Sequence, residues 1–411
     1  MNTATNTNTQ LNRSLSLPLV ILYGLGVTVG AGIYVLIGAT VGKAGIYAPL
    51  AFILAAIVMA FSAASMAELS ARFPVSAGEA AYVKEGFQRS WLSLLTGLLV
   101  ITSGLVSAAT VSIGSVGYIQ HILNIPQVWI IFLVVFTMGT IAIWGIQESV
   151  IFAAVFTIIE VGALLAIVFF AIWQQPELVY EVPKIIPAAS DFTALAAISG
   201  AGLLAFFAFI GFEDIVNLAE EAKEPRKTIP LAIFATLIGA TSIYVMVAAV
   251  AVLAVPLDQL SASKAPVGLL FERIMGSSPL VITLIAIVAT LNGVIIQMIM
   301  VSRVIYGLSR QGSIPSFLGK VYPYTQTPVI ATLLVMFVIL ILALLFPIEL
   351  LAELTSSVAL CIFVLINLSL CLIKLRESPT EPTKGLRVGL WVPILGAFLS
   401  TCFLLASWLL S

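Results

Sequence analysis

The amino-acid sequence predicts an all-α integral membrane protein with about eleven transmembrane helices. The first observation is composition: of 411 residues, 61% are hydrophobic and only 9% are charged, and the mean hydropathy is +1.16. Soluble globular proteins carry roughly 25% charged residues, so this chain has too few charges to cover a water-facing surface of its size. The second observation is that apolar runs of about 20 residues, the length that crosses a bilayer, recur along the chain. We therefore expect one transmembrane domain over residues 1–411, in contact with the lipid bilayer.

The individual helices are predicted from these runs and from the turns between them. The stretch from Ser90 to Gln147 contains no charged residue and needs two helices, which Asn124-Ile125-Pro126 separates. Residues 1–14, rich in Thr and Asn at their start, are expected to form a flexible cytoplasmic tail. The expected helices cover residues 17–42, 45–68, 91–119, 127–146, 149–173, 193–219, 229–254, 279–309, 328–346, 350–373 and 388–410.

The basic residues predict how the helices are oriented, because Lys and Arg prefer cytoplasmic loops. With the N-terminus inside, fourteen of the 18 basic residues fall on the cytoplasmic side. The four on the other side are Lys43, Lys184, Lys264 and Arg273. An odd number of helices then puts the C-terminus outside. We expect a multi-pass protein of the cell membrane with a cytoplasmic N-terminus and an extracytoplasmic C-terminus.

Several classes of function are disfavoured by what the sequence contains. Three cysteines, all in apolar runs, and a single histidine offer neither a disulfide framework nor a cluster of metal ligands. A membrane enzyme would need a nucleophile with its base, or a metal, so we expect no enzymatic activity and no cofactor. The net charge of −1 gives no general attraction to nucleic acid.

The first expected helix is interrupted by glycines. Gly24, Gly26, Gly30 and Gly32 fall within nine residues, and each weakens a helix by roughly 1 kcal/mol relative to alanine. One interpretation is close packing between helices through small residues. The other is an unwound segment, which is tolerated at membrane depth only where it lines a cavity. We favour the second interpretation.

The sixth expected helix is also irregular. It reads Phe206-Phe207-Ala208-Phe209-Ile210-Gly211-Phe212-Glu213-Asp214, with a glycine and two carboxylates inside an apolar run. Two discontinuous helices would expose free N–H groups for a carboxylate and free C=O groups for an ammonium, which suits a zwitterionic amino acid. Paired interruptions in corresponding positions indicate a transporter built from two repeats, here 17–173 and 193–373, with 388–410 as an additional eleventh helix.

At these residues the chain resembles the amino acid–polyamine–organocation superfamily. The segment from Gly26 to Tyr34 matches that family's first-helix signature, G-x-x-x-G-[AS]-G-I-[FY], and Phe206 to Glu213 is similar to its sixth-helix signature. Glu220 to Pro230 and Met300 to Gly307 resemble the loop after the sixth helix and the eighth helix, in the expected order. The resemblance implies a leucine-transporter-type fold of five plus five inverted helices, with helices 1 and 6 discontinuous.

The resemblance also implies the binding residues and the mechanism. The substrate carboxylate would meet the backbone of the first helix, and the amino group would meet carbonyls near the break in the sixth. Phe207 would act as a gate. These expectations give a secondary active transporter for amino acids, coupled to protons or, alternatively, to sodium, by symport or exchange. The implied binding residues are Val29, Gly30, Ala31, Gly32, Phe207, Ala208 and Ile210.

Two carboxylates are candidates for coupling, because a charge inside the bilayer is costly and is a functional candidate by default. Glu160 lies mid-helix, where some relatives carry a lysine, and a buried carboxyl favours its neutral form and could take up a proton. The alternative is a neutral glutamate bonded to a neighbouring helix. Glu213 follows the sixth-helix break and links to a polar partner or caps the following half-helix. Asn292 and Gln297 are interpreted as polar contacts between helices, and Glu68 with Arg72 as a surface ion pair.

The identity of the substrate is predicted only broadly. The first-helix segment lacks a charged residue, and Phe207, Phe209 and Ile210 are apolar, which favours a neutral amino acid. A channel or an amino-acid sensor without coupled transport remains the alternative. The oligomeric state is left open.

Overall fold

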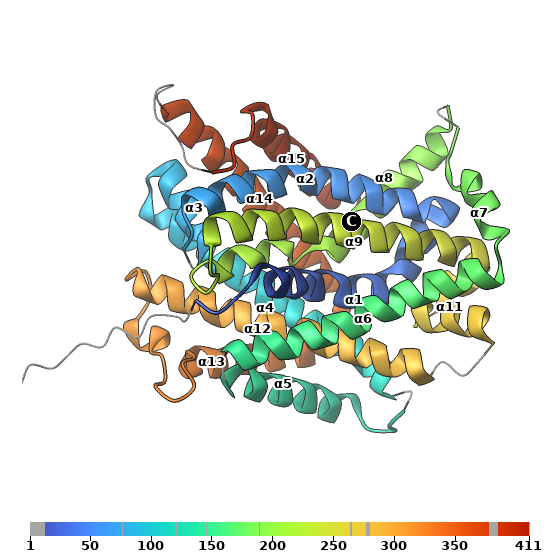
Figure 1. Cartoon of the computed structure of the whole chain (residues 1–411), viewed down its shortest axis with the longest axis horizontal. Coiled ribbons are helices and arrows are strands. Elements are labelled where there is room, and N and C mark those ends of the chain that lie inside the picture. Colours follow the sequence, from blue (N-terminus) through green and yellow to red (C-terminus); the bar gives the residue numbers. More distant parts are fainter. Residues whose placement is uncertain are drawn as a thin grey trace, which may run out of the picture.

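The protein is a bundle of long helices that run side by side along its longest axis (Figure 1). The computed structural model describes residues 13–75, 77–120, 122–144, 146–188, 190–263, 265–276, 280–377 and 385–410. Nearly all of the predicted tail over residues 1–14 lies outside these residues. Within them the regular structure is helical, apart from an isolated parallel bridge between Leu15 and Ala222.

Every expected transmembrane helix has a counterpart at the expected place. Among the described residues, eight spans are long and apolar enough to cross a membrane, and a pair bent by 41° within Phe192–Leu218 makes a ninth. Two shorter apolar helices occupy the remaining predicted positions. The helices are α1 (Leu17–Ala44), α2 (Ala48–Arg72), α4 (Ser90–Gln120), α5 (Gln127–Trp144), α6 (Ile146–Gln174), α8 (Phe192–Phe209), α9 (Pro225–Ala254), α12 (Leu280–Arg310), α13 (Val329–Leu345), α14 (Ile348–Arg376) and α15 (Trp391–Leu410).

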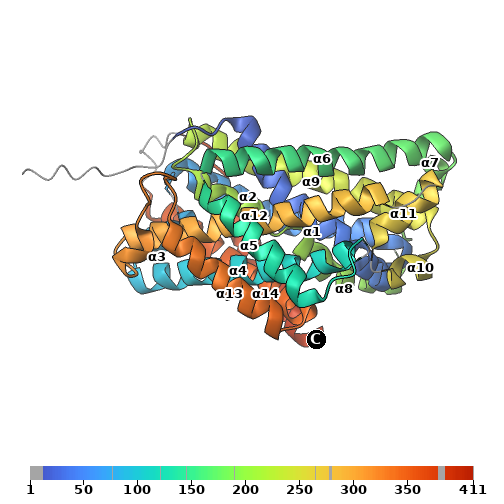
Figure 2. The same cartoon turned by 90° about the horizontal axis from the view of Figure 1, so that it is seen from below.

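Short helices cap the two ends of the bundle and were not expected from hydropathy, because they are too short to span a membrane. Figures 1 and 2 show α3 at one end and α7, α10 and α11 at the other; we call these the α3 end and the α7 end. At the α3 end, Arg376 of α14 donates a hydrogen bond to the Gly86 carbonyl of α3. Arg273, in α11, lies at the α7 end. The short elements are α3 (Gly78–Phe87), α7 (Leu178–Glu181), α10 (Leu257–Ala262), α11 (Pro266–Met275) and the 3₁₀ helices η1 (Gly45–Tyr47), η2 (Val182–Ile185), η3 (Phe212–Leu218) and η4 (Ser316–Gly319).

The expected interruption of the first helix is wrong, because α1 is one α-helix from Leu17 to Ala44. Its glycines instead allow close approach of other helices. A Cβ at Gly26 would lie 2.7 Å from Asn292 Nδ2, and one at Gly24 would lie 2.5 Å from Thr236 Oγ1. Cβ atoms are essentially never so close to other heavy atoms. The glycine run therefore serves close packing between helices.

The sixth expected helix changes geometry where its glycine falls. The α-helix α8 ends at Phe209, Gly211 has φ of 119°, and the chain continues as η3. Only glycine adopts this φ readily, and here a Cβ would also lie 2.7 Å from Val27 Cγ2 of α1. Glu213 Oε2 accepts a hydrogen bond from the Gly211 N–H at 2.8 Å, which satisfies a backbone donor at the start of η3.

The chain before α1 is attached to the segment after η3. The Leu15 N–H donates to the Glu221 carbonyl at 3.0 Å, and the Lys223 N–H donates to the Leu15 carbonyl at 3.0 Å. Leu15 and Ala222 are both fully buried. The start of α1 is therefore held against residues 221–223, which follow η3.

Candidate functional site

The expected binding residues of α1 and α8 lie against one another. A Cβ at Gly32 would lie 2.7 Å from both the Cα and the carbonyl oxygen of Ala208. Val29 and Ala208 are buried, and Phe207 and Ile210 are 8% and 7% exposed. The side chain of Ala31 lies outside the described part of the chain. The structure therefore brings the two predicted segments together, although α1 offers helical rather than unwound backbone.

Tyr244 of α9 contacts both segments through its hydroxyl group. The hydroxyl lies 2.7 Å from the Ala208 carbonyl oxygen and also approaches the Thr28 carbonyl oxygen. The end of α8 at Phe209 and the turn at Gly211 leave the Ala208 carbonyl without regular helical continuation. One hydroxyl hydrogen can bond to only one acceptor fully, so Tyr244 serves two carbonyl oxygens with a single donor. No pattern in the sequence pointed to Tyr244.

Glu160 is fully buried on α6 and faces α12. Asn292 Nδ2 donates to Glu160 Oε1 and to Thr157 Oγ1, each at 3.1 Å. The Glu160 backbone carbonyl accepts from the Tyr34 hydroxyl of α1 at 3.1 Å. Glu160 Oε2 and Asn292 Oδ1 lack hydrogen-bond partners among the described residues. Asn292 is thus a polar contact between helices, as expected, and Glu160 is held at a junction of α1, α6 and α12.

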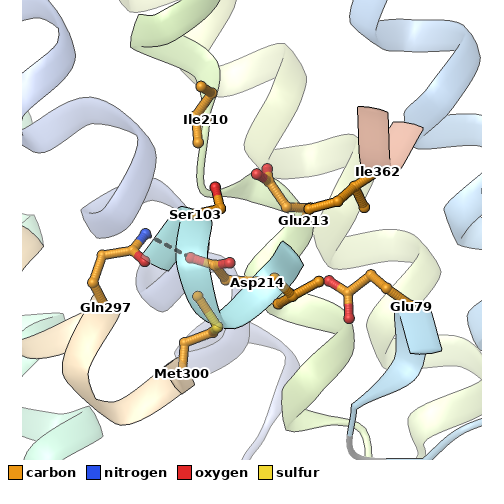
Figure 3. A pocket seen from close by; sticks show the side chains of 9 residues that line it. Glu79, Ser103, Ile210, Glu213, Asp214, Gln297, Met300 and Ile362 are labelled. Atoms are coloured by element: carbon orange, nitrogen blue, oxygen red, sulfur yellow. Dashed lines mark hydrogen bonds between the residues drawn. The ribbon is translucent and has the colours of Figure 1, made fainter. Parts of the chain in front are cut away.

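Glu213 borders a small polar cavity together with Glu79, Asp214 and Gln297, and we call this the acidic cavity. Figure 3 shows Asp214 and Gln297 pointing toward one another, and Gln297 Nε2 donates to Asp214 Oδ2 at 2.8 Å. The cavity measures about 10 Å³, which is close to the space needed by one water molecule. Its lining residues are Glu79, Val100, Ser103, Ile210, Glu213, Asp214, Gln297, Met300 and Ile362.

No prediction from the sequence pointed to Glu79, which lies between the expected helices over residues 45–68 and 91–119. It lies in the first turn of α3, and the Asn217 side chain anchors that turn. Asn217 Oδ1 accepts from the Gly78 N–H and Asn217 Nδ2 donates to Glu79 Oε1, both at 3.2 Å. Burial, and to a smaller extent nearby Glu213, raise the pKa of Glu79 from 4.5 to about 8, against hydrogen bonds that lower it. A carboxylate between small and apolar residues, as in Ala77-Gly78-Glu79-Ala80-Ala81, was the available signal.

Glu68 and Arg72 are part of a buried network, so their interpretation as a surface pair is wrong. Glu68 is 0% exposed and accepts from Lys374 Nζ and the Val388 N–H, each at 2.7 Å, and from Arg72. Arg72 also pairs with Glu377, which accepts from Arg387 at 3.1 Å. We call Glu68, Arg72, Lys374, Glu377 and Arg387 the Glu68 cluster. The spacing of Glu68 and Arg72 predicted their contact, but only the fold brings α14 and the start of the last segment onto them.

Comparison with known proteins identifies the family. The model of the family described as amino acid permease matches residues 15–410. The branched-chain amino acid permease BcaP of Bacillus subtilis is 28% identical over 408 residues, which cover 92% of this chain and 84% of that protein. The mitochondrial cationic amino acid transporter 3 of Arabidopsis thaliana is 27% identical over 90% of this chain. Cationic amino acid transporter 4 of Mus musculus is 27% identical over 91% of this chain.

The match extends over different shares of these relatives. The chain covers 64% and 62% of the plant and mouse transporters, which is less than two thirds of their length. The family and its relatives are transport proteins rather than enzymes, and the long apolar helices fit a multi-pass membrane protein. With a family match that runs from the bridge at Leu15 almost to the C-terminus, the chain belongs to the amino acid permease family.

Proposed function

We propose that the protein is a secondary active transporter that moves amino acids across the cell membrane by alternating access. The observation that carries this proposal is the end of α8 at Phe209 against a closely packed α1. Alternating access needs elements that can separate and close again around a small site, and irregular backbone at membrane depth is typical of such sites. The proposal includes two five-helix repeats, 17–173 and 193–373, with 388–410 outside them, and a cytoplasmic N-terminus.

The substrate amino group is assigned to the carbonyl oxygens near the end of α8. The Tyr244 hydroxyl supplies one hydrogen to two carbonyl oxygens, of Thr28 and Ala208. An ammonium group has three donors and could satisfy both oxygens at once. The helical surface of α1 at Val29, Gly30 and Gly32 is proposed as the opposing wall, and Phe207 as the gate. The apolar surroundings favour a neutral amino acid.

Glu160 is the proposed proton carrier. Its Oε2 and the Oδ1 of Asn292 are acceptors without donors among the described residues. Protonation of Oε2 would create a donor beside the amide that already bonds to Oε1. A proton therefore improves the hydrogen bonding of Glu160 and Asn292. A sodium ion at the same oxygen would need several further oxygen ligands to complete its coordination.

The transport function is tested by counterflow of labelled amino acids in proteoliposomes that contain the full chain. We expect saturable exchange, which distinguishes a carrier from a channel with unsaturable flux and from a sensor without flux. Gly32→Ala is expected to abolish exchange because its Cβ would collide with Ala208. Gly117→Ala is the matched control, since nothing lies within 4 Å of its Cβ position. Exchange that is equally fast in both variants would contradict the proposed site.

The coupling role is tested separately with Glu160→Gln. This side chain has a similar shape and can still bond to Asn292, but it does not titrate. We expect loss of accumulation driven by a proton gradient, with counterflow retained because exchange needs no gradient. Glu272→Gln, on the exposed surface of α11, is the control. Full gradient-driven accumulation by Glu160→Gln would rule out Glu160 as the proton carrier.

A further inference from the structure

The acidic cavity is assembled from five parts of the chain that meet at η3. Glu79 comes from α3, Ser103 from α4, Glu213 and Asp214 from η3, and Gln297 from α12. Ile362 of α14 also borders the cavity. Figure 3 shows the side chains of Glu79, Asp214 and Gln297 reaching it from separate elements. A site with this origin changes shape whenever η3 moves relative to α3 or α12.

The charge of the cavity is unbalanced. Glu79, Glu213 and Asp214 are 1%, 7% and 3% exposed, and among the described residues that line the cavity none is basic. Buried carboxylates normally have a cationic partner or are neutral, because an isolated buried charge is strongly unfavourable. Arg303 of α12 pairs with Glu221, with Nε 3.1 Å from Oε1, and its Nη1 lies 3.3 Å from Ser302 Oγ. The protein itself therefore supplies little positive charge to the three carboxylates.

Two buried oxygens at the cavity have no donor within the described chain. They are Glu79 Oε2 and Gln297 Oε1. The orientation of the Gln297 amide follows from its other end, since Nε2 donates to Asp214 Oδ2 at 2.8 Å. When Asp214 is ionised, exchanging the amide atoms would place two acceptor oxygens against each other, so the Gln297 oxygen keeps its place without a donor. Carboxylate and amide oxygens without donors are suitable ligands for a hard cation or acceptors for a proton.

We propose that Glu79, Glu213, Asp214 and Gln297 form a binding site for one small cation, either Na⁺ or a proton shared by the carboxylates. The cavity volume suits a single such ion and excludes an amino acid in this conformation. The site is separate from Glu160, which contacts Asn292 and Thr157 on the α6 side of α12. Binding of a cation at this site does not depend on the proposed transport function. Only a role of the bound cation in coupled transport rests on that function.

Other polar and titratable groups near the site could also respond to pH or to cations. On η3 and α3 they are Glu213, Asp214, Asn217 and Glu79, and Tyr82 lies near Glu79. From α12 they are Gln297 and the paired Arg303, and from α1 the Tyr23 hydroxyl, 3.5 Å from the Ile296 carbonyl oxygen. The lining residues of α4 and α14 are uncharged. A response to cations that is lost on changing Glu79 or Gln297 is therefore assignable to this cavity.

The test is thermal unfolding of the purified full chain in detergent, in NaCl or choline chloride at equal ionic strength, across a pH series. A ligand that binds only the folded state raises the unfolding midpoint. If Na⁺ is the ligand, NaCl raises the midpoint above choline chloride, most clearly at alkaline pH. If a proton is the ligand, the midpoint falls with rising pH in both salts. Either response supports the site if Glu79→Gln and Gln297→Met remove it while Glu181→Gln retains it.

Two results would overturn the proposal: a wild-type midpoint that responds to neither Na⁺ nor pH, or responses that persist unchanged in both cavity variants. Gln297→Met conserves volume and carries the test if Glu79→Gln does not fold. Amino acids are added in a separate series. A wild type that responds to cations but is not stabilised by any amino acid, and that exchanges none, would contradict the proposed transport function while leaving the cation site supported.

Discussion

The Glu68 cluster and the acidic cavity are both buried groups of carboxylates associated with the α3 end, yet they are built in opposite ways. Glu68 has a cation or an N–H donor on each oxygen, and Glu377 is shared by Arg72 and Arg387. The cavity carboxylates have amide and backbone donors, and Glu79 Oε2 has no partner among the described residues. A carboxylate with both oxygens paired holds helices together, whereas one with an unpaired oxygen can exchange a ligand.

The largest effect is expected from Glu68→Gln. The substitution leaves Lys374 and Arg72 buried with one carboxylate fewer, and breaking a buried ion pair costs about 3–5 kcal/mol. We expect a loss near the upper end of that range, measured as unfolding free energy in detergent. Glu181→Gln is the control, because its pair with Lys184 is exposed at 39% and 61% and exposed pairs contribute roughly 0–1 kcal/mol. Similar stability in the two variants would contradict the idea that the paired oxygens of Glu68 hold the helices together.

A second large effect is expected from Arg303→Met, which leaves Glu221 buried alone. Both side chains of this pair are 1% exposed, and burial already raises the pKa of Glu221 despite the opposing effect of Arg303. Glu221 can therefore respond by taking up a proton, so the loss should lie near the lower end of about 3–5 kcal/mol. Adding Glu221→Leu should recover most of the stability, because an apolar pair replaces an ionic one. If the double variant is no more stable than Arg303→Met, the loss of stability comes from poorer packing at these positions and not from the unpaired Glu221 carboxylate.

The pH dependence of stability separates the two regions without disrupting packing. Because burial raises the pKa of Glu79 from 4.5 to about 8, the folded state retains a proton that the unfolded state has released within this window. The free energy of unfolding should therefore decrease as pH rises from 4.5 to 8. Glu79→Gln should make this decline shallower, measured by unfolding midpoints over that range. An unchanged slope would mean that Glu79 does not titrate in the folded state.

The smallest effect is expected from Arg387→Gln. Arg387 is half exposed and donates to Glu377, which keeps its second partner, Arg72. An exposed ion pair contributes roughly 0–1 kcal/mol, so the unfolding free energy should change by no more than that. A loss of unfolding free energy comparable to that of Glu68→Gln would show that the half-exposed Arg387 stabilises the cluster as strongly as its buried members do.

Hydropathy predicted the helices well because the bilayer restricts spans to apolar helices of sufficient length. It could not decide the role of the α1 glycines, since glycine both weakens a helix and permits close packing. The deciding contacts, Asn292 at Gly26 and Ala208 at Gly32, come from helices distant in the sequence. The binding segments were predicted from a resemblance, and their meeting was found in the structure. Tyr244 and Glu79 were not predicted, because their significance depends entirely on what the fold places beside them.

The backbone bridge at Leu15 has a consequence for the region that precedes α1. Two hydrogen bonds join Leu15 to Glu221 and Lys223, so the chain leading into the first helix is coupled mechanically to the segment following η3. A force or an added domain ahead of Leu15 would therefore act directly on the segment that follows η3. Fusion proteins should therefore carry their partner at the opposite terminus, and the first dozen residues offer a handle from which transport could be slowed without touching the binding site.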